Sequence, residues 1–251
     1  VYASFAVGNK EPNRDDYINA GTEQPKPERL NDLEAGYELN GSNYRASLNG
    51  FGMFYKDQLV LTGKINDVGE YIRQNVPQSY RLGVELDTKW QFSRSFSWAA
   101  NAALSTNKVK DFTEYDDDYD NGGQIVNSYK KTDIAFSPSF VGSSELSFNP
   151  FKNTDLGLIS KYVSKQYLDN TSHEDRTINS FFTNDLRLRY QTSFRGITHV
   201  GLTLLVNNVF NELYETNGYT FSYNYGGVFT TENYYFPQAT RNFLLSLSLK
   251  F

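Results

Sequence analysis

The chain has 251 residues, a formal net charge of −5, a sequence pI near 5.2 and no cysteine. The absence of cysteine excludes a disulfide framework, the mild acidity argues against a nucleic-acid partner, and no window approaches the roughly 18 consecutive apolar residues of a membrane-spanning helix. A mean hydropathy of −0.58 does not exclude a membrane β-barrel, because barrel strands hide their apolar half by alternation.

About ten stretches alternate between apolar and polar residues, which is the period of a β-strand. In chain order they cover residues 1–7, 33–39, 44–54, 80–92, 96–107, 136–148, 156–162, 186–191, 200–206 and 241–251. In the clearest, Leu82 and Val84 share one face while Arg81 and Glu85 share the other. Nineteen tyrosines and nineteen phenylalanines also favour strands. The predicted fold class is therefore all-β.

Short and long connections alternate strictly between these strands. Tight turns are predicted at 40–43, 93–95, 149–153 and 194–196, and long polar segments at 9–29, 56–78, 108–133, 165–180 and 211–240. Bacterial outer-membrane barrels have short periplasmic turns and long extracellular loops. We therefore expect an antiparallel transmembrane β-barrel with its apolar face toward lipid, although alternation alone would equally suit a soluble barrel or sandwich that packs this face inward.

The last strand shows the pattern with few faults. One face carries Phe243, Leu245, Leu247, Leu249 and Phe251, and the printed sequence stops on that aromatic residue. Such an ending is typical of the closing strand of an outer-membrane barrel.

Candidate catalytic groups are few. The two histidines are His173, in a long loop, and His199, at the start of a strand. His173 with Asp175 can be imagined in a surface protease, but the chain has no Gly-x-Ser-x-Gly motif to supply a nucleophile. We favour two exposed histidines and predict no catalytic residue and no cofactor.

The acidic segment 116–122 is the one candidate metal site. Its carboxylates suit Ca²⁺, but Gly122 falls one place late for an EF-hand and Asn127 stands where the bidentate Glu is required. We favour a solvated acidic loop and predict no metal site. The Gly-Gly pairs at 122–123 and 226–227 lack a following helix and lysine, so we expect turns rather than phosphate loops.

Aromatic residues concentrate in segment 214–236, interleaved with Asn, Thr and Gly. Rigid rings with polar tips suit the capture of a bulky ligand at a barrel mouth. The candidate ligand-binding residues are Tyr219, Phe221, Tyr223, Tyr225, Tyr234 and Tyr235. The alternative is that these rings pack on neighbouring loops or form the membrane-interface girdle.

Several sequence stretches, taken in their order and spacing, match a pattern known from one protein family. They are residues 1–16 (VYASFAVGNKEPNRDD), 54–60 (FYKDQLV), 69–75 (GEYIRQN), 206–211 (VNNVFN) and 234–243 (YYFPQATRNF), followed by the terminal Phe251. Together they resemble TonB-dependent outer-membrane receptors, with a lean towards the siderophore-receptor branch. Thr240 departs from the Gly that often precedes the Arg in this family. The resemblance implies a barrel of about 22 strands with a plugged lumen, of which residues 1–251 would be the C-terminal portion. The plug domain and N-terminal strands would lie upstream.

The resemblance implies a receptor in the bacterial outer membrane that binds a scarce nutrient, such as a ferric siderophore, and imports it with TonB energy. It adds Asn13 and Arg14 to the candidate ligand-binding residues. The implied partners are the TonB complex through the plug, outer-membrane lipid, a small-molecule or metal-chelate ligand, and a surface lipoprotein. The barrel-assembly machinery would read the last strand. The alternatives are a stand-alone ten-stranded barrel acting as an adhesin or surface protease, and a soluble β-sandwich binding module.

Overall fold

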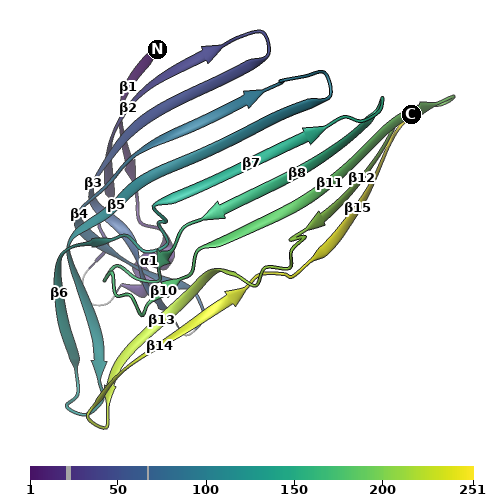
Figure 1. Ribbon diagram of the computed structural model, residues 1–251. Helices are drawn as coiled ribbons and strands as arrows, with labels where there is room; N and C mark the ends of the chain where they lie inside the picture. The colour runs from purple at the N-terminus through teal and green to yellow at the C-terminus, as the bar shows by residue number, and fades with distance from the viewer. Residues whose placement is uncertain (21–23, 67) are drawn as a thin grey trace.

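Ten strands form a curved antiparallel wall in which each strand pairs with the next wall strand along the chain (Figure 1). They are β1 (Tyr2–Lys10), β2 (Glu28–Asn40), β3 (Tyr44–Ile65), β4 (Tyr71–Trp90), β5 (Phe96–Asp118), β7 (Phe140–Phe148), β8 (Thr154–Val163), β11 (Phe181–Phe194), β12 (Ile197–Asn207) and β15 (Asn242–Lys250). These confirm the predicted number and order of strands. The computed structural model describes residues 1–20, 24–66 and 68–251; residues 21–23 and 67, in two predicted long connections, lie outside the described residues. No helix in the described part of the chain has the length and apolar character needed to cross a membrane.

The strand register aligns the apolar residues of neighbouring strands on one face. Leu247 of β15 lies opposite Leu202 of β12, which lies opposite Tyr190 of β11. Leu86 of β4 lies opposite Leu48 of β3 in the same way. Leu48 is 52% exposed and Leu202 is 40% exposed, so this face is a surface and not a core. The predicted outward orientation of the apolar face is confirmed, and a sandwich with that face inward is excluded.

The opposite face of the wall is polar and internally paired. Arg187 Nη2 lies 2.5 Å from Glu145 Oε1 and 3.1 Å from Asp155 Oδ1, and Arg189 Nε lies 3.0 Å from the same Asp155 oxygen. Gly157 leaves room for the guanidinium, because a Cβ at this position would lie 3.1 Å from Arg187 Nη2. Arg187 and Arg189 are therefore held in ion pairs on the inner face, as a hydrated lumen allows.

The wall is an open arc. β1 and β15 are the two ends of its strand order and do not pair with each other, and Figure 1 shows them well apart. A barrel in hydrocarbon has to satisfy every backbone group by closing. The ten strands alone therefore do not make the stand-alone ten-stranded barrel that was the alternative prediction.

The long connections contain further strands and are not plain loops. β3 and β4 keep pairing as far as Ile65 and Tyr71. β5 continues beyond the wall to pair with β6 (Gln124–Asp133), while β13 (Glu215–Tyr225) and β14 (Val228–Pro237) form a second hairpin. The remaining elements are α1 (Arg14–Asn19), β9 (Gln166–Tyr167) and β10 (Thr177–Ile178). We call the end of the wall that carries these elements the loop end.

Two turn predictions are confirmed, and one strand boundary differs from the prediction. Gly122, Gly123, Gly226 and Gly227 all have positive φ at the hairpin tips, a conformation that glycine adopts without strain. Phe136, predicted as the start of a strand, lies before β7 with φ of 52°. Its side chain packs edge-on against the ring of Tyr71 at the loop end.

The buried apolar core lies at the loop end. Val60, Val76, Val109, Phe112 and Ile134 pack together from β3, β4, β5 and the segment after β6. Burial of these apolar side chains away from water stabilises the extended parts of the strands. This core fixes the elements that surround the site described next.

Candidate functional site

A polar cavity of about 790 Å³ lies at the loop end. Its walls come from α1, the extended parts of β3, β4 and β5, the segment 164–180 between β8 and β11, and β13. The charged residues that line it are Asp16, Lys26, Asp57, Arg73, Asp111, Glu114, Asp116, Asp169 and Arg176. A recess of this size with convergent polar groups is the usual form of a small-ligand site.

Arg176 is the centre of the buried part of this cavity. Its Nη1 donates to Glu114 Oε1 and, at 2.8 Å, to Asp169 Oδ2. The side chains of all three residues are at most 8% exposed. Burial acts to lower the pKa of Arg176, but the two carboxylates outweigh it and raise that pKa. Burial, and then a 2.9 Å hydrogen bond to Glu114, raise the pKa of Tyr129.

Segment 164–180 is tied to the strands by its own polar side chains. Asn170 donates from Nδ2 to the carbonyl of Leu61 and accepts from the backbone N–H of Ala135 at 2.8 Å. Ser172 Oγ donates to Asp133 Oδ2 at 2.9 Å. No sequence pattern identifies these residues, because their partners lie 35 to 109 positions away and no periodicity marks them.

Asn13 and Arg14, two predicted ligand-binding residues, lie at the start of α1. The side chain of Asn13 accepts from the N–H of Asp16 at 2.9 Å, and Asp16 Oδ2 accepts from the N–H of Asn13, so the two form a capping box. Asp16 is also held by a two-pronged contact with Arg73, at 2.7 and 2.8 Å. Asn13 therefore has a structural role here, and Arg14 is exposed beside it.

The β13–β14 hairpin carries most of the predicted aromatic residues on one face, which we call the aromatic face. Its members are Tyr219, Phe221, Tyr223, Tyr225 and Tyr234. The rings of Tyr219 and Tyr234 stack at 4.9 Å, and Phe221 meets Tyr219 edge-on at 5.4 Å. Hydrogen bonds from the phenols of Tyr234 and then Tyr223 lower the pKa of Glu232 on this face.

The other face of this hairpin borders the cavity. Thr220 and Ser222 alternate with the aromatic residues along β13 and line the cavity. Tyr235, the sixth predicted aromatic residue, also belongs to this face and donates from its hydroxyl to the carbonyl of Thr177 at 3.0 Å. The structure thus brings the predicted rings together, but none of them lines the cavity. Their role as ligand contacts stays a prediction.

The acidic segment 116–122 lies at the tip of the β5–β6 hairpin and contacts the tip of the β13–β14 hairpin. Asp120 accepts from the N–H groups of Gly226 and Gly227, each at 2.7 Å, and Asp118 accepts from Asn224 Nδ2 at 2.9 Å. Hydrogen bonds from Asn121 and then Asn224 lower the pKa of Asp118. We call these interactions the tip contact. Within the described ranges, no group of three or more His, Cys, Asp or Glu side chains is placed to hold a metal ion.

The two histidines lie on different elements. His173, in segment 164–180, has Nδ1 3.7 Å from Asp175 Oδ1 and Nε2 3.3 Å from the hydroxyl of Tyr129. His199 lies on β12, opposite Lys250 of β15. His173 therefore joins the polar network around Arg176 through Tyr129.

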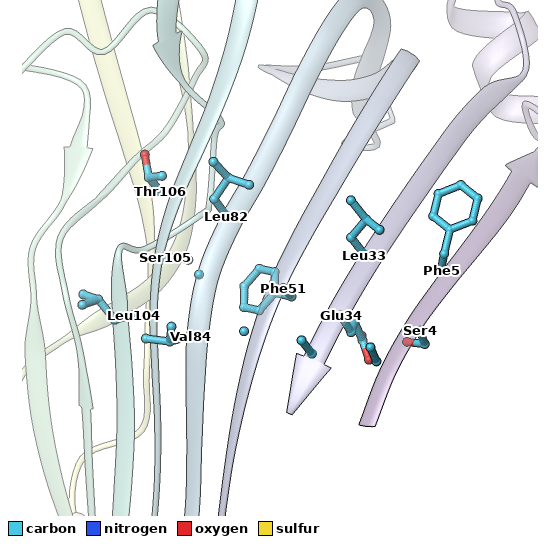
Figure 2. Close-up of a pocket in the computed structure, with 14 residues that line it drawn as sticks. Ser4, Phe5, Leu33, Glu34, Phe51, Leu82, Val84, Leu104, Ser105 and Thr106 are labelled. Atoms are coloured by element: carbon cyan, nitrogen blue, oxygen red, sulfur yellow. The ribbon is translucent and has the colours of Figure 1, made fainter. Parts of the chain in front are cut away.

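An apolar hollow lies on the wall itself and differs in character from the cavity. It has a volume of about 1120 Å³, and Figure 2 shows Phe5, Leu33, Leu82 and Val84 along neighbouring strands around it. Most of its large apolar side chains, such as Phe5, Leu33 and Leu82, belong to the outward face of the wall. Phe51 lies opposite Glu34 and Gly83 and belongs to the inner face. Because it is open and lacks convergent polar groups, hydrocarbon chains of lipid suit it better than a polar ligand.

The last strand has the predicted register. Phe243, Leu245 and Leu247 lie opposite Val206, Leu204 and Leu202 of β12. Leu249 continues this face, and Phe251 follows β15 at the end of the chain. Recognition of these five residues by the barrel-assembly machinery stays a prediction.

Comparison with known proteins agrees with the fold. The family model described as "TonB dependent receptor-like, beta-barrel" matches residues 1–211. No curated protein sequence matches the chain significantly. The siderophore receptor PiuA from Acinetobacter baumannii has a TM-score of 0.67 at 17% identity, with 98% of this chain and 33% of that chain covered.

Two further solved structures are similar. The ferric yersiniabactin uptake receptor FyuA from Yersinia pestis has a TM-score of 0.59 at 20% identity, with 92% of this chain and 32% of that chain covered. The copper transporter OprC has a TM-score of 0.67 at 17% identity, with 98% and 36% covered. The chain thus spans about a third of the length of the solved receptors that it matches. The outward apolar face, the structured loop end and the match over residues 1–211 together show that the chain belongs to the TonB-dependent receptor β-barrel family of the bacterial outer membrane.

Proposed function

We propose that the chain forms the C-terminal part of the barrel of a receptor that binds a scarce nutrient at the cell surface and imports it with energy from TonB. The plug and the remaining strands would be supplied by upstream sequence. The observation that carries the proposal is the polar cavity of about 790 Å³ at the loop end of a lipid-facing wall. Receptors of this family act by binding and release, so the proposal includes no chemical step.

A metal chelate, such as a ferric siderophore, is the proposed class of nutrient. Support comes from the similar structures, of which one is named as a siderophore receptor, one as a ferric yersiniabactin uptake receptor and one as a copper transporter. The proposed partners are TonB through the plug, outer-membrane lipid along the apolar face, and the barrel-assembly machinery at the last strand. A surface lipoprotein over the mouth is a further proposed partner.

The test is uptake by cells that carry or lack the gene for the full-length receptor. Iron-55 would be supplied as a panel of ferric siderophores, each in strains with and without TonB. We expect at least one chelate to be taken up only when both the receptor and TonB are present. Iron uptake that depends on neither the receptor nor TonB for every chelate in the panel would refute the proposed nutrient class.

Two sets of residues are candidates for ligand contact, and paired variants separate them. Thr220→Val with Ser222→Ala alters the cavity wall, whereas Tyr219→Ala with Tyr234→Ala alters the aromatic face. We expect weaker chelate binding in the first pair, because its hydroxyl groups border the cavity. Weaker binding only in the second pair would assign the ligand to the predicted aromatic residues instead.

A further inference from the structure

The polar cavity contains more negative than positive side chains. Among the described lining residues, the carboxylates are Asp16, Asp57, Asp111, Glu114, Asp116 and Asp169, and the cations are Lys26, Arg73 and Arg176. A recess with charge of one sign and walls of low dielectric constant focuses the electric field and concentrates ligands of the opposite sign. The lining therefore favours positive charge.

Both arginines are already engaged by lining carboxylates. Arg73 makes two hydrogen bonds to Asp16, at 2.7 and 2.8 Å. Arg176 donates from a single nitrogen to both Glu114 and Asp169. Three carboxylates thus surround two guanidinium groups and outnumber their positive charges. The buried Nε of Arg176 has no hydrogen-bond partner among the described residues.

Asp57 and Asp111 bring two further carboxyl groups to the cavity at points where strand pairing is interrupted. Asp57 has φ of 53° and Asp111 has φ of 55°. Neither residue pairs with the neighbouring strand, although the residues before and after each of them pair in unchanged register. Asp and Asn tolerate this left-handed conformation better than other residues with a Cβ. Asn75 fixes the first site by donating from Nδ2 to the carbonyl of Asp57 at 2.6 Å.

A buried hydroxyl in the same cavity also points to a ligand. Thr220 is 4% exposed and lines the cavity, and its Oγ1 has no hydrogen-bond partner among the residues that the structure describes. Native proteins satisfy nearly all buried polar atoms of this kind. A threonine hydroxyl can donate one hydrogen bond and can also accept, so a polar ligand group such as an ammonium N–H would satisfy it.

We infer that the cavity selects a ligand with positive charge and N–H donors, such as a metal chelate with a free ammonium group. Asp57 and Asp111 determine this specificity, and Thr220 accepts a hydrogen bond from the ligand. The inference rests on the proposed function and adds to it the sign of the ligand's charge.

The experiment compares two iron complexes that differ only in charge. One is the ferric complex of a linear trihydroxamate with a terminal ammonium group, and the other is its N-acetylated, uncharged analogue. Dissociation constants would be measured with the purified full-length receptor, as wild type and as the Asp57→Asn/Asp111→Asn variant. Asp87→Asn is the matched control, because this exposed residue of β4 lies ten positions beyond the cavity residue Pro77, about 33 Å along an extended strand.

We expect the wild-type receptor to bind the ammonium form at least about tenfold more tightly than the acetylated form. This ratio should approach one in the double variant and persist in Asp87→Asn, and heat-modifiable gel migration would show that each variant is folded. A wild-type ratio of one or less, a ratio unchanged by the double substitution, or no binding of either complex would overturn the inference. If one of these results were obtained and the receptor still took up an anionic ferric tricatecholate with TonB, the inference would be wrong but the proposed function would still hold.

Discussion

Replacing Arg176 with methionine should loosen segment 164–180 without unfolding the wall. The substitution keeps a long side chain but removes the cation that, among the described residues, forms ion pairs with Glu114 and Asp169. Those carboxylates are 8% and 4% exposed, so they would remain buried, close together and uncompensated. Removal of one partner from a buried ion pair costs about 3–5 kcal/mol, which corresponds to a roughly 100- to 5,000-fold increase in the population of the opened segment.

Hydrogen–deuterium exchange of the full-length receptor measures this population directly. Amides of segment 164–180 should lose protection by that factor, while amides of β8 and β11 should be unaffected. Lys165→Met is the control in the same segment, because Lys165 and its partner Glu174 are 42% and 72% exposed. Exposed pairs contribute at most about 1 kcal/mol. Protection in Arg176→Met that matches the control would refute the assignment of Arg176 as the centre of this network.

Two further predictions concern the wall and the tip contact. Leu202→Arg places a charge on the outward face and should lower the free energy of unfolding in lipid vesicles, measured by urea titration, by about 2–4 kcal/mol. Thr203→Arg places the same charge on the inner face and should lower it much less. Equal losses in the two variants would contradict the outward orientation. Because the pKa of Asp118 is lowered from its ordinary 3.8, the tip contact is fully stabilised above that value and loses this stabilisation as the pH falls through the lower folded pKa. The exchange protection of the Asn121 amide, which donates to Asp118 Oδ1, should therefore fall in strong acid in the wild type but not in Asp118→Asn. An identical acid response in both proteins would contradict this role of Asp118.

The wall could be predicted from sequence because lipid and lumen impose different chemistry on its two faces. Val200, Leu202 and Leu204 alternate with smaller or polar residues for that reason, and their register in the structure follows the pattern. Tight turns between wall strands were equally visible, since their residue types are specific to turns.

The loop end could be predicted only in part. β13 alternates strictly from Gly218 to Tyr225, and this period of two indicates both a strand and its aromatic face. No such pattern predicts the contacts of Arg176 and Asp120. Arg176 contacts Glu114, 62 residues away, and Asp120 contacts Gly226, 106 residues away, and only folding brings these residues together. Side chains that face protein on both sides obey no simple alternation.

The tip contact has a consequence for how this surface can vary. Exposed ends of loops normally accept insertions and deletions freely, but here the end of one hairpin is fastened to the backbone of the other through Asp120. Lengthening either hairpin alone would separate the carboxylate from its amide donors. Insertions or deletions in one hairpin should therefore be accompanied by matching changes in the other. The lengths of two segments far apart in the gene should thus vary together.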